Sequence, residues 1–270
     1  MRAGLSHGIV VGASSDIGLA VVRDWLGRGI SVTGTYRTSS AALDAVAHDL
    51  AGLIHCDFAS RDSMNALLSK LRERESSVWD YLLVCPGTME PVGPFSQIDI
   101  DHWSACFEIN FMATMRIVHG LLPLRRQGCE PPLVLLFAGG GTNSAPLSFS
   151  AYTAAKIALI KSIELLDAEM PDVRFTILGP GWVRTKIHEE TLHAEHMAES
   201  AAIETRRRLM SDDFNPISRV VDCVAWAMQA PKEIIGGRNF SVVHDLWGRP
   251  ELTERLMADA NMYKLRRSGN

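Results

Sequence analysis

The chain has 270 residues, of which 47% are hydrophobic and 21% are charged, and its formal net charge at pH 7 is -4. A chain of this length can bury one substantial core, so we expect a single domain. The small negative net charge does not indicate the basic surface that nucleic-acid binding requires. Neither a run of membrane-spanning length nor a charged-then-apolar leader is present, which predicts a cytoplasmic protein without membrane association.

The cysteines are odd in number and lack C-x-x-C pairing. They are Cys56, Cys85, Cys106, Cys129 and Cys223. This distribution indicates neither a disulfide framework nor a zinc site. We expect buried thiols in a reducing compartment.

A glycine-rich turn follows the first predicted strand, the apolar run of residues 7–11. Gly12 permits a tight turn, and Gly18 allows the following helix to pack closely on the strand. Amides in the first helical turn carry a partial positive charge that suits a pyrophosphate. The candidate phosphate-binding residues are Gly12, Ser14, Ser15, Asp16, Ile17 and Gly18. The alternative is an ordinary strand-to-helix turn in which Ser14, Ser15 or Asp16 caps the helix.

The residues that follow the second predicted strand, residues 30–35, indicate which nicotinamide cofactor the protein binds. Arg37 follows this strand, and no acidic residue appears before Asp44. In a dinucleotide-binding fold an acidic residue here accepts hydrogen bonds from the ribose 2'-hydroxyl, whereas an arginine accommodates a 2'-phosphate. The sequence therefore favours NADP(H) over NAD(H), the alternative being a solvated loop arginine.

Short apolar strands alternate with amphipathic helices through the rest of the chain. Helices are expected at about 41–50, 61–75, 98–128 and 216–229 and from Glu251, and strands at 53–56, 79–84, 132–137 and 239–243. This alternation predicts an α/β fold with a parallel sheet that helices cover on both faces.

The long helical pattern over residues 98–128 carries a polar residue on its apolar stripe. Phe107, Asn110, Thr114 and Ile117 follow one another at three- and four-residue steps, so we expect the Asn110 amide to be buried. A buried amide must find hydrogen-bond partners. Two interpretations stay open: Asn110 holds a water or a backbone carbonyl for structural reasons, or it takes part in a proton relay.

A tyrosine and a lysine four residues apart open the next predicted helix. Tyr152 and Lys156 share one helix face at this spacing. A tyrosine hydroxyl titrates near about 10, so it exchanges protons poorly at neutral pH unless a fixed cation favours the phenolate. Lys156 is the candidate cation. The alternative is a surface tyrosine packed on a lysine stem.

These motifs, in this order and spacing, resemble the short-chain dehydrogenase/reductase family in its single-domain form. The matching positions are residues 12–18, Asp57 after the third strand, Asn110, Tyr152 with Lys156, and residues 180–185 after the sixth strand. The resemblance implies a Rossmann-type, doubly wound sheet of about seven strands, formed by residues 1–270 as one NAD(P)-binding domain. It also implies hydride transfer between NAD(P) and a small alcohol or carbonyl substrate, with Arg37 favouring NADP(H), and we expect a homodimer or homotetramer.

The resemblance also implies a role for each matching residue. Tyr152 would be the general acid/base, and Lys156 would lower the pKa of Tyr152 and bind the nicotinamide ribose. Asn110 would hold a water that links Lys156 to solvent, and Asp57 would contact the adenine. The other cofactor contacts implied by the family pattern are Gly87, Pro180, Gly181, Val183 and Thr185.

The sequence departs from the family pattern at the serine that hydrogen-bonds the substrate. Its place falls at Ala138 or Gly139, and losing a donor to a developing oxyanion costs on the order of 3 kcal/mol. We expect a substitute from the loop that follows, among Thr142, Asn143 and Ser144. A second departure places Asp16 at the middle glycine of the turn, where we expect it to point away from the phosphates and cap the helix.

The missing serine leaves the function open between two classes. The first is an NADP(H)-dependent oxidoreductase that uses Tyr152 and Lys156. The second is a catalytically silent NADP(H)-binding sensor or partner subunit. A sugar-nucleotide epimerase or dehydratase is a third possibility, although such relatives are longer and carry an extra substrate lobe.

Residues 186–210 are helical in pattern, and the resemblance implies a mobile substrate lid over about 186–215. The segment carries His188, His193 and His196. Only the last two share a helix face, so we expect no metal site. The arginine run at 206–208 is either a solvated face or a receiver for an acidic or phosphorylated substrate.

Overall fold

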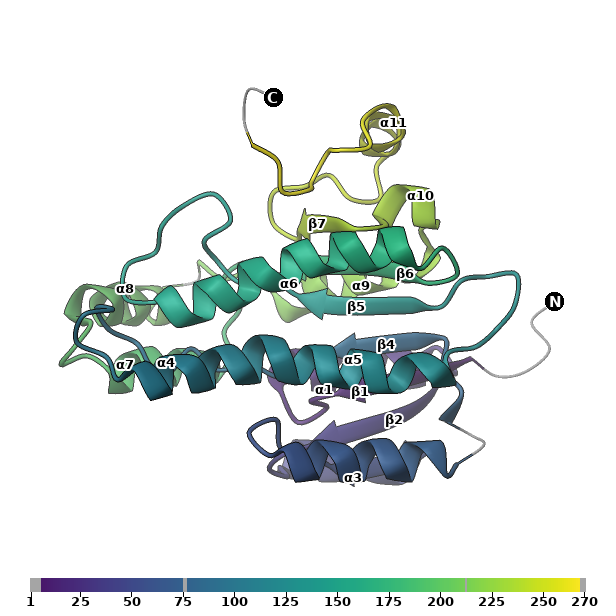
Figure 1. Cartoon of the computed structure of the whole chain (residues 1–270), viewed down its shortest axis with the longest axis horizontal. Coiled ribbons are helices and arrows are strands. Elements are labelled where there is room, and N and C mark those ends of the chain that lie inside the picture. Colours follow the sequence, from purple (N-terminus) through teal and green to yellow (C-terminus); the bar gives the residue numbers. More distant parts are fainter. Residues whose placement is uncertain (1–5, 75–76, 212, 268–270) are drawn as a thin grey trace.

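Seven parallel strands form one sheet within the residues that the structure describes, which are 6–74, 77–211 and 213–267 of a computed structural model (Figure 1). The strand order is β3-β2-β1-β4-β5-β6-β7, and neighbouring strands are parallel throughout. The strands are β1 (His7–Val11), β2 (Ser31–Tyr36), β3 (Gly52–His55), β4 (Tyr81–Val84), β5 (Leu133–Phe137), β6 (Arg174–Gly179) and β7 (Arg238–Ser241). This arrangement confirms the predicted doubly wound, Rossmann-type α/β fold.

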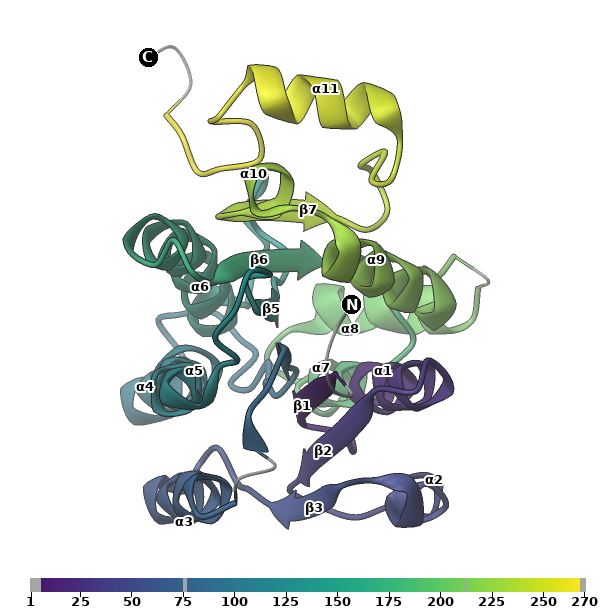
Figure 2. The same cartoon turned by 90° about the vertical axis from the view of Figure 1, so that its right-hand side faces the viewer.

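Helices cover both faces of the sheet (Figure 2). One face carries α1 (Asp16–Gly27), α2 (Ala41–Asp44) and α9 (Ile217–Gln229), and the other carries α3 (Arg61–Arg72), α4 (Ile100–Phe107), α5 (Thr114–Leu121) and α6 (Ser150–Glu169). Each layer has its own apolar core, with Trp25 and Phe240 on the first side and Trp79 and Phe175 on the second. Burial on both sides explains why β1 and β5 are continuous apolar runs without alternation.

Polar caps fix where several helices begin. The side chains of Ser15, Ser60 and Asp99 accept hydrogen bonds from backbone amides in the first turns of α1, α3 and α4. These amides lack an acceptor within their own helix, so a cap stabilises the helix start by about 1 kcal/mol. The three helices therefore begin close to the positions that the sequence predicts.

The prediction of one continuous helix over residues 98–128 is wrong. α4 runs into a π-helical turn, η3 (Glu108–Ala113), which is followed by α5 and a 3-10 turn, η4 (Leu122–Leu124). Asn110 lies in the π-helical turn, where its Nδ2 donates to the carbonyl oxygen of Cys106 at 2.9 Å. A side chain that bonds to the preceding turn in this way disturbs the regular ladder. Asn110 is fully buried, as the apolar stripe predicts.

Two other predicted helices are interrupted. The segment 41–50 contains the four-residue α2 and a 3-10 turn, η1 (Ala47–Asp49), and the segment 186–210 contains α7 (Ile187–His193) and α8 (Glu199–Leu209). The break between α7 and α8 allows Ala198 to pack against Met89 and Val92. Both helices lie beyond the carboxyl ends of the strands (Figure 1).

The chain ends with α10 (Lys232–Ile235), which the sequence does not predict, then β7 and α11 (Pro250–Ala258). The expectation of buried thiols holds for three of the cysteines but is wrong for Cys85, which is half-buried, and Cys129, which is exposed. Cys129 lies in the turn before β5, outside both apolar cores. None of the helices in the described ranges combines the length and apolarity needed to cross a bilayer.

Candidate active site

A pocket of about 1670 Å3 opens beyond the carboxyl ends of the strands. It lies where the strand order reverses between β1 and β4, which is the place where open α/β sheets bind ligands. The pocket is lined by Gly12, Ser14, Ser15, Asp16, Ile17, Arg37, Asp57, Gly87, Tyr152, Lys156, Pro180, Gly181, Val183 and Thr185. Gly18 packs behind the glycine turn and Asn110 packs behind Gly87. The structure therefore gathers the candidate residues of the sequence around one crevice.

The glycine turn after β1 has the close packing that its sequence predicts. Gly12 has a φ of +84°, and a Cβ added to Gly18 would collide with the carbonyl oxygen of Gly12. The amide of Gly12 donates to Oγ1 of Thr35 at 3.0 Å, which fixes the turn to β2. Ser15 caps α1 through a 3.1 Å bond from the amide of Gly18. Because first-turn amides lack intrahelical acceptors, this end of α1 suits an anion.

Asp16 does not cap α1, contrary to the expectation from the sequence. Its Oδ2 accepts a hydrogen bond from the amide of Lys186 at 3.0 Å, across 170 residues of sequence. Ser15 already supplies the cap, so the Asp16 carboxylate extends toward the segment before α7. This contact joins the glycine turn to the predicted lid.

A guanidinium and a carboxylate stand on the same side of the crevice. Arg37 is exposed at the tip of β2, and Asp57 follows β3, the neighbouring strand. Oδ1 of Asp57 accepts from the amide of Ala59 at 2.9 Å, which shapes the turn that leads into α3. Both residues therefore lie next to the glycine turn, where the sequence predicts the adenosine end of a dinucleotide.

Tyr152 and Lys156 both project from α6 into the pocket. Nζ of Lys156 lies 5.6 Å from the centroid of the Tyr152 ring and donates to the carbonyl oxygen of Phe137 at 3.1 Å. Burial lowers the pKa of Lys156 to about 8, while the nearby thiols of Cys85 and Cys106 oppose this decrease. Lys156 is therefore mostly protonated at pH 7.

The pKa of Tyr152 moves in the opposite direction from that implied by the family resemblance. Burial raises this pKa, and the Cys106 thiol and the Glu190 carboxyl raise it further. Lys156 does not offset this increase: its ammonium group lies 5.6 Å from the ring centroid and bonds to a backbone carbonyl. The phenol consequently stays protonated throughout the neutral pH range.

Gly139 provides the space that the Tyr152 ring occupies. A Cβ at position 139 would lie 2.6 Å from Cε1 and 2.8 Å from the hydroxyl oxygen of Tyr152. Both distances are shorter than van der Waals contact, so a serine here would displace the ring. Ala138, the residue directly after β5, is buried. The absence of a side chain at Gly139 therefore leaves the space into which the Tyr152 ring packs.

The loop after Gly139 carries the polar side chains that the sequence suggests as substitutes. Thr142, Asn143 and Ser144 are exposed, and all three line the pocket. Gly141 precedes them with a φ of +102°, a conformation that favours glycine. This turn directs the polar segment along the rim of the same crevice as Tyr152.

Asn110 is bonded at the back of the pocket to the loop that follows β4. Its Oδ1 accepts from the amide of Thr88 at 3.3 Å, and its Nδ2 donates to the carbonyl oxygen of Thr88 at 2.8 Å. A Cβ on Gly87 would lie 2.8 Å from Oδ1 of Asn110 and 3.6 Å from Nζ of Lys156. A side chain at position 87 would therefore crowd the asparagine and approach the lysine.

An aromatic stack connects α7 with α8. The rings of Trp182 and His188 are nearly parallel with centroids 4.1 Å apart, and the guanidinium of Arg208 lies 4.8 Å from the Trp182 ring. Nε2 of His188 is 2.9 Å from the carbonyl oxygen of Val183. These contacts give His188 a packing role. Across the described ranges, no three potential metal-binding side chains of the His, Cys, Asp or Glu type gather at one place.

The arginine run is paired with acidic residues of its own segment. Arg206 forms an ion pair with Glu195 at 2.7 Å, and Arg207 and Arg208 each pair with Glu204 at 2.7 Å. This arrangement matches the interpretation of the run as a solvated face. Of the three arginines, Arg208 also lines the pocket.

Sequence reasoning missed two residues at this site, Thr88 and Glu190. The Glu190 carboxyl, on α7, accepts hydrogen bonds from Oγ1 of Thr88 at 3.1 Å and from the amide of Met89. The partners are 102 and 101 residues apart in sequence. Neither residue belongs to the motifs of the glycine turn or the tyrosine helix, so the sequence offers no local signal for this contact.

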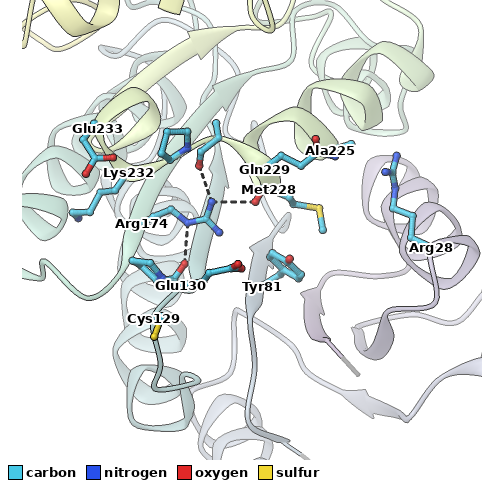
Figure 3. A pocket seen from close by; sticks show the side chains of 13 residues that line it. Arg28, Tyr81, Cys129, Glu130, Arg174, Ala225, Met228, Gln229, Lys232 and Glu233 are labelled. Atoms are coloured by element: carbon cyan, nitrogen blue, oxygen red, sulfur yellow. Dashed lines mark hydrogen bonds between the residues drawn. The ribbon is translucent and has the colours of Figure 1, made fainter. Parts of the chain in front are cut away.

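A second cavity, of about 590 Å3, lies at the opposite end of the sheet, beside the first residues of β4 and β6 (Figure 3). Arg174 is 7% exposed here, and its guanidinium donates to the carbonyl oxygens of Pro131, Met228 and Ala230 at 2.9, 3.0 and 2.7 Å. Figure 3 shows these bonds converging on one guanidinium. Arg174 thus joins β6 to the end of α9 and to the turn before β5.

We expect the substitution Arg174→Leu to lower the free energy of unfolding by about 2–4 kcal/mol, because it leaves buried carbonyl groups without their donor. Denaturant unfolding measures this change. Arg28→Leu is the matched control, since Arg28 makes an exposed pair with Asp24 at 2.7 Å, and such pairs contribute about 0.5 kcal/mol. Equal destabilisation by both variants would contradict the structural role of Arg174.

The fold and the arrangement of the pocket define a Rossmann-type α/β protein. A family model described as short chain dehydrogenase matches residues 7–196. The chain therefore belongs to the short chain dehydrogenase family, which is a family of oxidoreductases, and this confirms the resemblance seen in the sequence.

Known proteins with similar sequences and structures agree with this assignment. The chain is 28% identical over 211 residues to the benzil reductase ((S)-benzoin forming) of Saccharomyces cerevisiae, with 72% of this chain and 78% of the relative covered. A short-chain dehydrogenase/reductase structure from Saccharomyces cerevisiae has a TM-score of 0.75 at 20% identity and covers 92% of this chain and 98% of its own. One from Burkholderia multivorans with bound NADP has a TM-score of 0.69 at 21% identity, with coverages of 90% and 99%. These structures confirm the fold.

Proposed function

We propose that the protein is an NADP(H)-dependent oxidoreductase that interconverts a carbonyl and an alcohol, with Tyr152 as the general acid/base. The observation that carries this proposal is the single crevice that joins the glycine turn, Arg37, Tyr152 and Lys156. Membership of the short chain dehydrogenase family and the similarity to a benzil reductase support the same class of reaction. Consumption of NADPH in the presence of benzil, compared between the wild type and Tyr152→Phe, tests it.

The residues of the crevice fit a nicotinamide dinucleotide. A Cβ at position 12 would lie 3.0 Å from Cδ of Pro86, so a glycine allows the loop after β4 to pack closely on the turn that would hold the phosphates. The first turn of α1 offers backbone amides to a pyrophosphate. When bound, NADP(H) would supply or accept the hydride. The NADP present in the Burkholderia multivorans neighbour supports this choice of cofactor.

Tyr152 holds the transferable proton on its hydroxyl oxygen. Because burial raises the pKa of Tyr152, the hydroxyl is protonated at neutral pH and donates to a substrate carbonyl oxygen. The Lys156 ammonium, whose pKa is about 8, stabilises the phenolate that remains after donation. In this proposal, Asn110 holds the water molecule that links Lys156 to solvent.

An apolar cluster packs around Tyr152. Met89 and Val92 follow β4, and they pack with Phe149 and with Ile187 of α7 around Tyr152. The arginine run nearby is neutralised by Glu195 and Glu204, which weakens the case for an acidic or phosphorylated substrate. We therefore propose a small, neutral, apolar ketone as substrate, covered by residues 186–215 as a lid.

The loop at residues 142–144 supplies the donor that replaces the family serine in this proposal. Thr142, Asn143 and Ser144 line the pocket, and each side chain can donate a hydrogen bond to a substrate oxygen. Glycines before the loop allow it to move inward when a substrate enters. A donor from this loop would approach the substrate from the rim, since the Tyr152 ring fills the space at Gly139.

We expect Arg37→Ala to raise the Kd for NADPH about tenfold and to leave the Kd for NADH within about twofold, because a guanidinium binds the 2'-phosphate that NADH lacks. Fluorescence titration of both cofactors measures the change. Arg61→Ala is the control, since Arg61 is an exposed arginine at the start of α3, and it should leave both values unchanged. Equal weakening of NADH and NADPH binding by Arg37→Ala would contradict the assignment.

A catalytically silent NADP(H)-binding sensor or partner subunit is the second candidate. The observation that favours it is the absence of a donor side chain at Ala138 and Gly139, together with a Tyr152 ring that packs against Gly139. Such a protein would bind NADPH and consume none with any ketone. Turnover that depends on Tyr152 separates the two candidates.

The proposal includes a homodimer or homotetramer that works in the cytoplasm. The family resemblance supports the assembly, and five free thiols support a reducing compartment. Light scattering after size-exclusion chromatography measures the assembly directly.

A further inference from the structure

Glu190 is a titratable group at the pocket to which the proposed mechanism gives no role. It lies on α7, is half-buried, and accepts hydrogen bonds from Oγ1 of Thr88 at 3.1 Å and from the amide of Met89. Burial raises the pKa of the Glu190 carboxyl, whereas these two donors lower it. Among the described residues, Glu190 forms no ion pair with a basic side chain. Its charge is therefore stabilised mainly by the loop after β4.

The loop residue that bonds to Glu190 also bonds to Asn110. Thr88 uses its side chain toward Glu190 and its backbone toward Asn110, with the amide donating to Oδ1 at 3.3 Å and the carbonyl accepting from Nδ2 at 2.8 Å. A Cβ placed on Gly87, the preceding residue, would lie 2.8 Å from Oδ1 of Asn110 and 3.6 Å from Nζ of Lys156. Hydrogen bonds therefore run from α7 through Thr88 to Asn110, close to the lysine of the candidate active site.

The same contacts hold α7 over the pocket. A half-buried carboxylate without a cationic partner is stable only while its hydrogen-bond donors stay in place. An outward movement of α7 would expose Glu190 to solvent and would remove the hydrogen-bond partner of Thr88. The position of α7 and the position of Thr88 are therefore linked, and Thr88 in turn contacts Asn110 through two hydrogen bonds.

We propose that Glu190 is a positioning residue that couples closure of α7 to the placement of Asn110 through Thr88. The catalytic consequence of this coupling rests on the proposed function, because it assumes that Asn110 serves the reaction of Tyr152 and Lys156. The coupling itself is a property of the chain and can be measured without turnover.

Hydrogen exchange tests the coupling in the full chain with NADPH present. We expect Glu190→Ala and Thr88→Val each to accelerate exchange of the amides of α7 and of residues 108–113 by about tenfold, since each variant removes the same side-chain contact. Thr88→Ser keeps the hydroxyl and should restore slow exchange. Glu189→Ala, the neighbouring exposed glutamate on α7, is the matched control and should exchange like the wild type.

Faster hydrogen exchange that is confined to α7, or no faster exchange at all, would overturn the coupling. Either result would mean that the contact of Glu190 acts only on α7 and does not affect residues 108–113. With benzil as substrate, Glu190→Ala should lower kcat about tenfold with a change in KM below about threefold. Faster exchange with unchanged kcat would overturn the positioning role. Absence of turnover in the wild type would count against the proposed function, while the exchange results would still decide the coupling.

Discussion

Replacing Tyr152 by phenylalanine is expected to lower kcat with NADPH and benzil by about a hundredfold to ten-thousandfold and to leave the Kd for NADPH unchanged. A positioned general acid contributes this amount to a proton transfer. The variant keeps the ring that packs against Gly139 and Met89 and loses the hydroxyl oxygen. Steady-state kinetics and cofactor titration on the same preparation separate chemistry from binding.

Tyr36→Phe is the control for this substitution. Tyr36 ends β2 with its ring edge against His55 and lies outside the pocket lining, so its variant should retain wild-type kcat. A Tyr152→Phe protein that turns over at the wild-type rate would exclude Tyr152 as the acid. A matching loss in NADPH affinity would assign the defect to binding.

Restoring the family serine is expected to impair the protein. Gly139→Ser should lower kcat with benzil by about a hundredfold, since a Cβ at this position falls 2.8 Å from the Tyr152 hydroxyl oxygen and forces the ring aside, and a misplacement of about 1 Å at the reacting group has an effect of this size. Overpacking should also lower the free energy of unfolding by about 1–3 kcal/mol. Kinetics and denaturant unfolding measure the two effects.

Gly140→Ser is the matched control, because a Cβ at position 140 meets no atom within 4 Å. This variant should unfold like the wild type, so the comparison isolates the overpacking at position 139. An increase in kcat for Gly139→Ser would show that the Tyr152 ring accommodates the serine, and it would remove the packing explanation for the missing residue.

The sequence alone predicts the features that depend on neighbouring residues. Strand β1, the Gly12 turn and the start of α1 follow from local patterns, as does the burial of Asn110 on its apolar stripe. The order of these motifs along the chain is also sufficient to identify the family. These properties can be predicted from the sequence because the spacing of apolar residues, the turn-forming residues and the helix caps each depend on a few neighbouring residues.

The features that the sequence could not predict arise from contacts between distant segments. Asp16 bonds to the amide of Lys186, and Glu190 bonds to Thr88, across 170 and 102 residues. The π-helical turn at Asn110 depends on carbonyl acceptors in the preceding turn and in the loop after β4. The raised pKa of Tyr152 follows from burial and from the nearby Cys106 and Glu190, which spacing on a helix does not specify.

Transfer of deuterium from labelled NADPH to a ketone is the most direct test of the central claim. The protein is incubated with benzil and NADPH that carries deuterium at its transferable position, and the product alcohol is examined by mass spectrometry. The proposed function predicts one deuterium on the carbinol carbon in the wild type, and labelled product that forms at least about a hundredfold more slowly with Tyr152→Phe. Tight NADPH binding without labelled product from benzil or from a panel of apolar ketones would contradict the claim and favour a silent cofactor-binding protein.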